Sequence, residues 1–119
     1  MVPSTPVDLT VDRKGEPWLA ALGVLWITDG DGDVAAIERT AAAAIDGGVR
    51  AVQLREPKLS ARELATLGAR LLPRLESVLG LLVVNDRVDV AAAGFAHGAQ
   101  VGHRSLPAAA ARRALPRPL

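Results

Sequence analysis

Polar residues with anion-binding chemistry follow an apolar stretch near the middle of this chain. Gln53, Arg55 and Glu56 come at the end of the run 49–56, which is otherwise mostly apolar. Alternation along a strand places Gln53 and Arg55 on one face. An Arg guanidinium binds two phosphate oxygens at once, and a Gln amide adds a neutral donor. The pattern indicates a phosphate-binding site. The competing interpretation is a strand that simply runs into a charged surface loop.

A second apolar run, 81–84, ends in Asn85 and Asp86. Asn85 shares a strand face with Leu81 and Val83, and Asp86 stands at the end of the strand. Beside a bound phosphate, an Asp and an Asn are typical ligands of a partly hydrated Mg²⁺ ion. The alternative is that Asp86 only caps the short helix that follows it.

The elements that must position these residues form a repeated strand-then-helix pattern. The expected strands are residues 24–28, 49–56, 81–84 and 98–102. The expected helices are 33–46, 88–93 and 108–115, together with one that starts at 60 and carries leucines as far as Leu75. Such alternation predicts parallel strands joined by right-handed crossovers. In a (β/α) barrel the carboxyl ends of the strands build the mouth of the active site. The sequence therefore predicts an α/β fold with four parallel β/α units.

Several residues mark the ends of the helices. Asp33 can cap the start of the first helix, and two glycines at 47–48 end it. Ser60 and Glu63 form a capping box at the start of the second helix. Pro73 lies inside that helix and is expected to kink or shorten it. Ser105 is expected to help start the last helix.

Length and composition exclude several classes of function. The chain has 119 residues, 50% of them hydrophobic, a net charge of +1 and no cysteine. Disulfides and thiolate metal sites are therefore excluded, and the absence of a basic stripe argues against a nucleic-acid partner. No secretory signal and no apolar run of about 18 residues is visible, so we expect a cytoplasmic protein without a membrane partner. Residues 1–22 read as an irregular N-terminal extension, and 23–119 as one domain.

Six short segments resemble the thiamine phosphate synthase/TenI superfamily. In order they read LWITD at 25–29, VQLRE at 52–56, LSAREL at 59–64, VNDRVDVA at 84–91, GAQVG at 98–102 and SLP at 105–107. The resemblance covers residues 24–115. It implies the N-terminal half of a (β/α)8 TIM barrel and a function in thiamine biosynthesis. The synthases join hydroxymethylpyrimidine diphosphate to thiazole phosphate and release pyrophosphate with Mg²⁺, whereas the TenI-like branch tautomerises a carboxythiazole phosphate.

The resemblance also implies roles for individual residues. Gln53, Arg55 and Lys58 would hold the diphosphate, Asn85 would contact the substrate, and Asp86 would be a Mg²⁺ ligand. The implied partner is a small-molecule phosphate or diphosphate.

Two positions depart from the synthase pattern. Pro57 stands where a synthase usually has a Lys, and Lys58 follows one place later. Ser105 stands where a synthase usually has a second Mg²⁺-binding Asp. Both departures lean toward the TenI-like branch, in which Glu56 is a candidate for proton transfer.

The family continues into four more β/α units, so this chain corresponds to about half of the usual barrel of about 250 residues. The open sheet edges invite pairing with another chain. A homodimer that closes the barrel, an open sheet that is stable alone, and pairing with a separate C-terminal half-barrel chain all stay open. A non-catalytic phosphate-binding or regulatory module is the alternative function.

Overall fold

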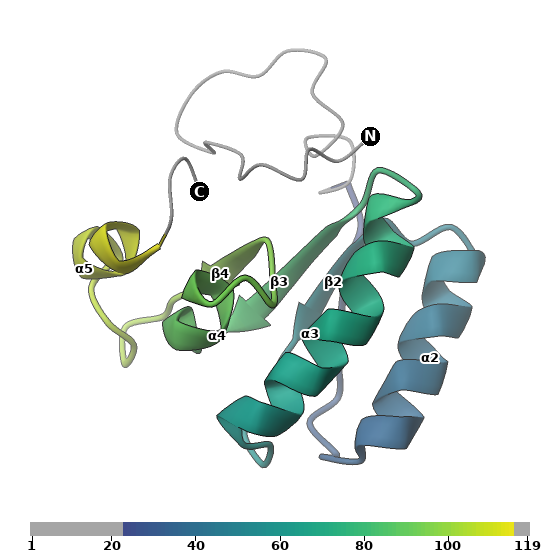
Figure 1. The fold of residues 1–119 in the computed structure, drawn as a ribbon, viewed down its shortest axis with the longest axis horizontal. Coiled ribbons are helices and arrows are strands. Elements are labelled where there is room, and N and C mark those ends of the chain that lie inside the picture. Colours follow the sequence, from purple (N-terminus) through teal and green to yellow (C-terminus); the bar gives the residue numbers. More distant parts are fainter. Residues whose placement is uncertain (1–22, 116–119) are drawn as a thin grey trace.

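The computed structural model describes residues 23–115. The expected extension, residues 1–22, and the two prolines expected to end the last helix, Pro116 and Pro118, lie outside the described residues. Four strands form one parallel sheet in the order β1-β2-β3-β4, as Figure 1 shows: β1 (Leu25–Ile27), β2 (Ala51–Leu54), β3 (Leu81–Asn85) and β4 (Gly98–Gln100). This is the predicted half of a TIM barrel.

Each strand is followed by a helix. The helices are α2 (Val34–Asp46), α3 (Ala61–Glu76), α4 (Val88–Ala92) and α5 (Ala108–Ala114). The two long helices, α2 and α3, lie side by side over one face of the sheet, whereas α4 and α5 lie toward β4 (Figure 1). No helix between residues 23 and 115 is long and apolar enough to cross a membrane.

The predicted helix ends are confirmed at three points. The Asp33 side chain accepts a hydrogen bond from the Ala36 N–H at 3.1 Å and caps α2. At the other end of α2, Gly48 has a φ of +113°, which a residue with a side chain rarely adopts. Ser60 and Glu63 form the capping box of α3 in both directions. Local hydrogen bonding therefore places the helices that face the sheet.

The expected effect of Pro73 on the length of α3 is wrong, because the helix continues through this residue to Glu76. A proline inside a helix loses one backbone hydrogen bond and crowds the preceding turn. Packing outweighs that cost here. The buried stripe of α3 consists of Leu64, Leu67, Leu71 and Leu75.

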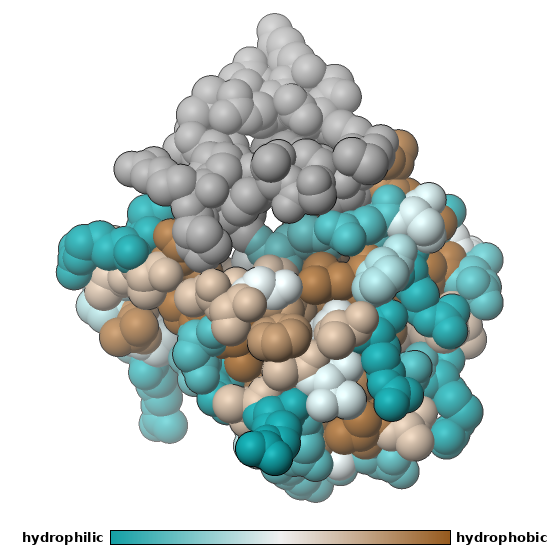
Figure 2. All heavy atoms as spheres, viewed as in Figure 1, coloured by the Kyte–Doolittle hydropathy of each residue, from teal (hydrophilic) through white to brown (hydrophobic). Residues whose placement is uncertain are grey.

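The core lies between the sheet and the helices. Strand residues that point toward the helices are almost fully buried, namely Val52, Leu54, Leu82 and Val84. The opposite face of the sheet, called the inward face below, carries Leu25 and Ile27 of β1, which are 36% and 45% exposed. In the space-filling view, hydrophilic side chains gather over α2 at the right, whereas the side of α4 and α5 mixes hydrophilic and more hydrophobic ones (Figure 2).

One close approach fixes α3 against the segment that leads into β4. A Cβ atom added to Gly68 would lie 2.0 Å from the carbonyl oxygen of Phe95. Only glycine fits at that distance, since real Cβ atoms do not approach so closely. The contact holds β4 at its place in the sheet.

Candidate functional site

The Glu56 side chain holds the loop after β1 against the end of β2. Glu56 is 4% exposed, and its two carboxylate oxygens accept hydrogen bonds from the backbone N–H groups of Gly30, at 3.0 Å, and Gly32, at 2.9 Å. Both glycines have positive φ angles, +89° and +79°. Hydrogen bonds to an ionised carboxylate are stronger than neutral ones. Glu56 and the two glycines therefore act as one unit, which we call the Glu56 clamp.

Thr28 joins the same two elements. Its backbone N–H donates to the Gln53 carbonyl at 3.0 Å, and its hydroxyl oxygen accepts from the Arg55 N–H at 2.9 Å. These bonds extend the contact between β1 and β2 past the ends of the strands. The backbone of Arg55 is thereby fixed, while its side chain is exposed and forms no ion pair with another residue of 23–115.

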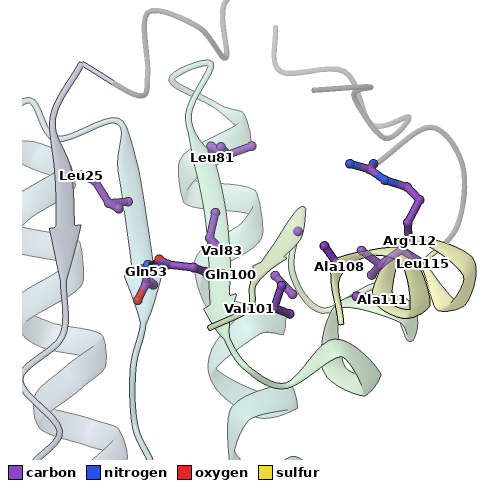
Figure 3. Close-up of a pocket in the computed structure, with 12 residues that line it drawn as sticks. Leu25, Gln53, Leu81, Val83, Gln100, Val101, Ala108, Ala111, Arg112 and Leu115 are labelled. Carbon is purple, nitrogen blue, oxygen red and sulfur yellow. Dashed lines mark hydrogen bonds between the residues drawn. The ribbon is translucent and has the colours of Figure 1, made fainter. Parts of the chain in front are cut away.

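Gln53 lies on the inward face and is 2% exposed. Its Nε2 donates a hydrogen bond to Oε1 of Gln100, so the two amides bridge β2 and β4 across β3 (Figure 3). No described residue donates a hydrogen bond to the side-chain oxygen of Gln53, Oε1. The pair borders a cavity of about 300 Å³, the larger cavity below, which is lined by Leu25, Gln53, Leu81, Val83, Gly98, Ala99, Gln100, Val101, Ala108, Ala111, Arg112 and Leu115.

Asp86 has an unusual backbone for a residue with a side chain. Its φ is +68°, its N–H donates to the Gln100 carbonyl at 2.8 Å, and its carbonyl accepts from the Val88 N–H at 2.9 Å. The carboxylate is exposed and bonds to no other described side chain or backbone group. The N-cap of the helix α4 is Arg87, which makes no side-chain hydrogen bond there. The alternative that Asp86 serves only to cap this helix is therefore wrong.

A smaller cavity, of about 190 Å³, joins the ends of β2 and β3. It is lined by Leu54, Glu56, Pro57, Leu59, Leu64, Asn85, Asp86 and Arg87. The structure thus brings the predicted residues Glu56, Asn85 and Asp86 to one place, whereas Gln53 borders the larger cavity. Arg55 and Lys58 are exposed and line neither of these cavities.

Lys58 lies over the loop after β1. A Cβ added to Gly32 would lie 3.0 Å from Cβ of Lys58 and 3.2 Å from its Cδ. The aliphatic stem of Lys58 therefore packs on this glycine, and the ammonium group is left at the surface. Lys58 forms no ion pair with the rest of residues 23–115.

Ser105 closes a turn after β4. Its hydroxyl oxygen accepts from the Gly102 N–H at 3.0 Å, and its own N–H donates to the Gly102 carbonyl at 3.0 Å. The residue that caps α5 is Pro107, which makes no side-chain bond there. The expectation that Ser105 helps start this helix is wrong.

The Arg87 side chain pairs with the neighbouring Asp89 rather than with a residue of the candidate site. Its guanidinium makes a two-point contact with Asp89, at 2.8 and 3.1 Å. The hydrogen bond with Arg87 holds the pKa of Asp89 below its usual value, and the same bond raises the pKa of Arg87. The Asp86 carboxylate is therefore left to meet a cation from solution.

Metal binding at this site would rest on few protein ligands. In the described part of the chain, no three His, Cys, Asp or Glu side chains gather closely enough to hold a metal ion. Mg²⁺ does not need such a cage, because it keeps several waters and is usually held by one or two carboxylates together with phosphates of the substrate. The exposed Asp86 carboxylate, beside Asn85, fits that requirement.

Comparison with known proteins shows the family of this chain. The family model described as thiamine monophosphate synthase matches residues 24–119. The chain belongs to this family. It is 41% identical over 95 residues to the thiamine-phosphate synthase of Archaeoglobus fulgidus, which covers 80% of this chain and 45% of that protein. It is 43% identical over 72 residues to the thiamine-phosphate synthase of Moorella thermoacetica, covering 60% and 34% of the two chains.

A solved structure shows the same fold. The thiamine phosphate pyrophosphorylase from Pyrococcus furiosus is similar with a TM-score of 0.68 and 32% sequence identity, over 78% of this chain and 45% of that chain. This member of the thiamine monophosphate synthase family therefore spans less than half the length of these relatives. Residues 24–119, which the family model matches, contain every strand described above, together with the candidate site.

The sequence patterns missed four residues that contribute to the site. Thr28, Gln100 and the two glycines of the Glu56 clamp make contacts between segments that are distant along the chain. One signal for the clamp was present, since Gly30 and Gly32 flank an Asp directly after a strand. Nothing local in the sequence pairs Gln53 with Gln100.

Proposed function

We propose that this half-barrel binds a substrate diphosphate together with Mg²⁺, as part of thiamine phosphate synthase chemistry. The reaction would couple hydroxymethylpyrimidine diphosphate with thiazole phosphate and release pyrophosphate. One observation carries the proposal: the Asp86 carboxylate is exposed, unbonded to described groups, and held in a left-handed backbone conformation at the end of β3. Such conformations cluster at ligand sites, where the surrounding structure enforces them.

The cations of the site are available for an anion. Arg55 and Lys58 are exposed at the end of β2, without ion pairs to described residues, and Thr28 and Gly32 fix where they emerge. A guanidinium can hold two diphosphate oxygens, while an ammonium acts as a point charge. Together they would offset part of the negative charge of the diphosphate.

Asp86 would hold the Mg²⁺ ion, and Asn85 would contact the substrate beside it. When bound, the ion would neutralise charge on the diphosphate and on the departing pyrophosphate. The protein contribution is to fix the position of the carboxylate. The hydrogen bond from the Asp86 N–H to the Gln100 carbonyl does this through the backbone.

The resemblance assigns Gln53 to the diphosphate, but Gln53 borders the larger cavity and not the smaller one beside Asp86. The Gln53–Gln100 pair would therefore recognise the organic part of the substrate. One amide function of each residue is used in their mutual hydrogen bond. The side-chain Oε1 of Gln53 can accept a hydrogen bond and Nε2 of Gln100 can donate one. The pair therefore offers both an acceptor and a donor to the edge of a heteroaromatic ring. The aliphatic lining of the larger cavity would take an apolar ring face.

Glu56 would support this site by holding the loop after β1 in position. Both of its oxygens are already used by the backbone of Gly30 and Gly32. This favours a positioning role for the residue. The proton-transfer role suggested by the TenI-like branch stays a prediction, and tautomerisation of a thiazole phosphate is the second form that catalysis could take.

A non-catalytic phosphate-binding or regulatory role is the alternative. The hydroxyl of Ser105, at the position of the usual second acidic ligand, already accepts from Gly102. Pro57 stands where a synthase usually has a Lys. A site with these changes would bind a diphosphate more weakly than a synthase, and thiamine phosphate formation by the purified chain would distinguish the two roles.

Titration calorimetry with inorganic pyrophosphate and Mg²⁺ tests the binding site. We expect weak, Mg²⁺-dependent binding that Arg55→Ala weakens by about tenfold or more, since a charged hydrogen bond contributes about 1.5–3 kcal/mol. Arg70→Ala is the matched control, because Arg70 lies on α3 and pairs with Glu38 at 3.0 Å, away from the strand ends. Equal heats for the wild type and Arg55→Ala would overturn the assignment.

A further inference from the structure

We propose that two copies of this chain close one eight-stranded barrel. The two-fold axis would run along the strands, and β4 of each copy would pair in parallel with β1 of the other. The inference goes beyond the proposed function, since such a barrel could form whether or not it binds a phosphate.

Both edges of the sheet are open among the described residues. The order β1-β2-β3-β4 gives β1 and β4 one strand neighbour each. Unpaired N–H and C=O groups on an edge strand are a template for pairing with another chain. The β1 edge also carries three nearby exposed aliphatic side chains, Val24 at 66%, Leu25 at 36% and Ile27 at 45%.

The larger cavity marks the place for the neighbouring strand. It lies between the inward face of the sheet and the segment of Ala111, in α5, and Leu115, just after it, and it borders β4 along Gly98 to Gln100 (Figure 3). The lining of the cavity is mostly aliphatic. Side chains of a second copy's β1, Leu25 and Ile27, have the matching apolar character and would fill the space beside β4.

Large and small side chains alternate from strand to strand on the inward face, and a second copy would continue this alternation. Strand register puts Leu25, Ala51 and Leu81 in one row across β1, β2 and β3. In the rows of Leu25 and Ile27, the odd strands thus present branched aliphatic side chains and the even strands present small or amide ones, with Gly98 on β4; Asn85, at the end of β3, is the exception. Barrel interiors fill in layers contributed by alternate strands. After β4, the next strand should carry large aliphatic residues, and β1 of a second copy does.

Closure would complete the candidate site. Two Gln53–Gln100 pairs, one from each copy, would stand on opposite sides of a single mouth. Gln100, which is exposed in the single chain, would then be walled by inward-facing residues of the other copy, while Gln53 is 2% exposed already. The proposed barrel would carry two identical sites related by symmetry.

The first test is the solution mass of the 119-residue chain by light scattering, from low to high micromolar concentration. We expect a species of twice the 12.4 kDa chain mass. Leu25→Lys should give a monomer with an unchanged circular dichroism spectrum, since Leu25 is 36% exposed. Leu79→Lys is the matched control, because Leu79 is 38% exposed and lies between α3 and β3. This variant should stay dimeric.

A second test identifies which edges meet, and it does not depend on how Leu25→Lys folds. The chain has no cysteine, so single cysteines can be placed freely. Copies with Ile27→Cys, at the end of β1, are mixed with copies with Val101→Cys, just after β4. A short bis-maleimide should link the two kinds of copy to each other in preference to like copies. A wild-type monomer at high micromolar concentration, or linking without this preference, would overturn the proposal.

Discussion

The Glu56 carboxylate accepts a hydrogen bond from the Gly32 N–H at 2.9 Å, across 24 positions of the sequence. Its other oxygen accepts from Gly30 at 3.0 Å. The end of β2 and the loop after β1 are thereby fixed to one another. The aliphatic stem of Lys58 packs on Gly32, so the same hydrogen bonds also fix the position of Lys58.

Removing the clamp should destabilise the fold. Glu56→Ala leaves two N–H groups without their acceptor in a part-buried place, at a cost of about 2–4 kcal/mol for the pair. Glu56→Gln keeps one acceptor oxygen and should cost less. Urea unfolding of the three proteins measures the difference. A free energy of unfolding for Glu56→Ala within about 0.5 kcal/mol of the wild type would contradict the clamp.

A side chain at Gly68 should also destabilise the fold. In Gly68→Ala the new Cβ would lie 2.0 Å from the Phe95 carbonyl oxygen, so α3 or the segment before β4 must move. Overpacking of this kind costs about 1–3 kcal/mol, which exceeds the helix propensity of alanine. Gly47→Ala is the control, because its Cβ would be 3.4 Å from the nearest oxygen and its φ is negative. Equal melting temperatures for the two variants would contradict the close approach.

His97 should make stability depend on pH. Its Nδ1 accepts from the Leu82 N–H at 2.8 Å, and its Nε2 lies 3.2 Å from the Glu76 carboxylate. Burial lowers the pKa of His97 below 6.5, and the contact with Glu76 opposes that shift only in part. The neutral ring is therefore the form that the fold favours.

The sign of the effect follows from this shift. A pKa that folding lowers contributes stability above the unfolded value of about 6.5, and this stability is lost as the pH falls through the folded pKa. Melting temperature should thus fall between pH 7 and pH 5. The fall should shrink in His97→Gln and persist in His103→Gln, which changes the other, exposed histidine. Identical pH profiles for both variants would contradict the role of His97.

Local signals predicted most of the fold. The caps at Asp33 and Ser60 and the alternation of apolar runs were enough to give four parallel β/α units. Three of the four strands were predicted too long, most of all 49–56, which is observed as Ala51–Leu54; the third, predicted as 81–84, is observed as Leu81–Asn85. A residue belongs to a strand only where a neighbouring strand pairs with it. The sequence of one segment does not show how far that pairing extends.

The parts that could not be predicted depend on distant contacts. The Gln53–Gln100 pair joins residues 47 positions apart, and its two members show no local pattern. Pro73 stays helical because the leucine stripe of α3 is buried against the sheet and α2, which outweighs the propensity of one residue. The left-handed conformation of Asp86 follows from its bond to the Gln100 backbone on the neighbouring strand, which no feature of the dipeptide reveals.

Binding of pyrophosphate to Asp86→Asn, with and without Mg²⁺, tests the central claim most directly. Asn tolerates the left-handed conformation about as well as Asp, so the fold should keep its melting temperature while the carboxylate is lost. We predict that Mg²⁺ strengthens pyrophosphate binding to the wild type and has little effect on the variant. The same Mg²⁺ dependence in both proteins would contradict the proposal that Asp86 holds the ion.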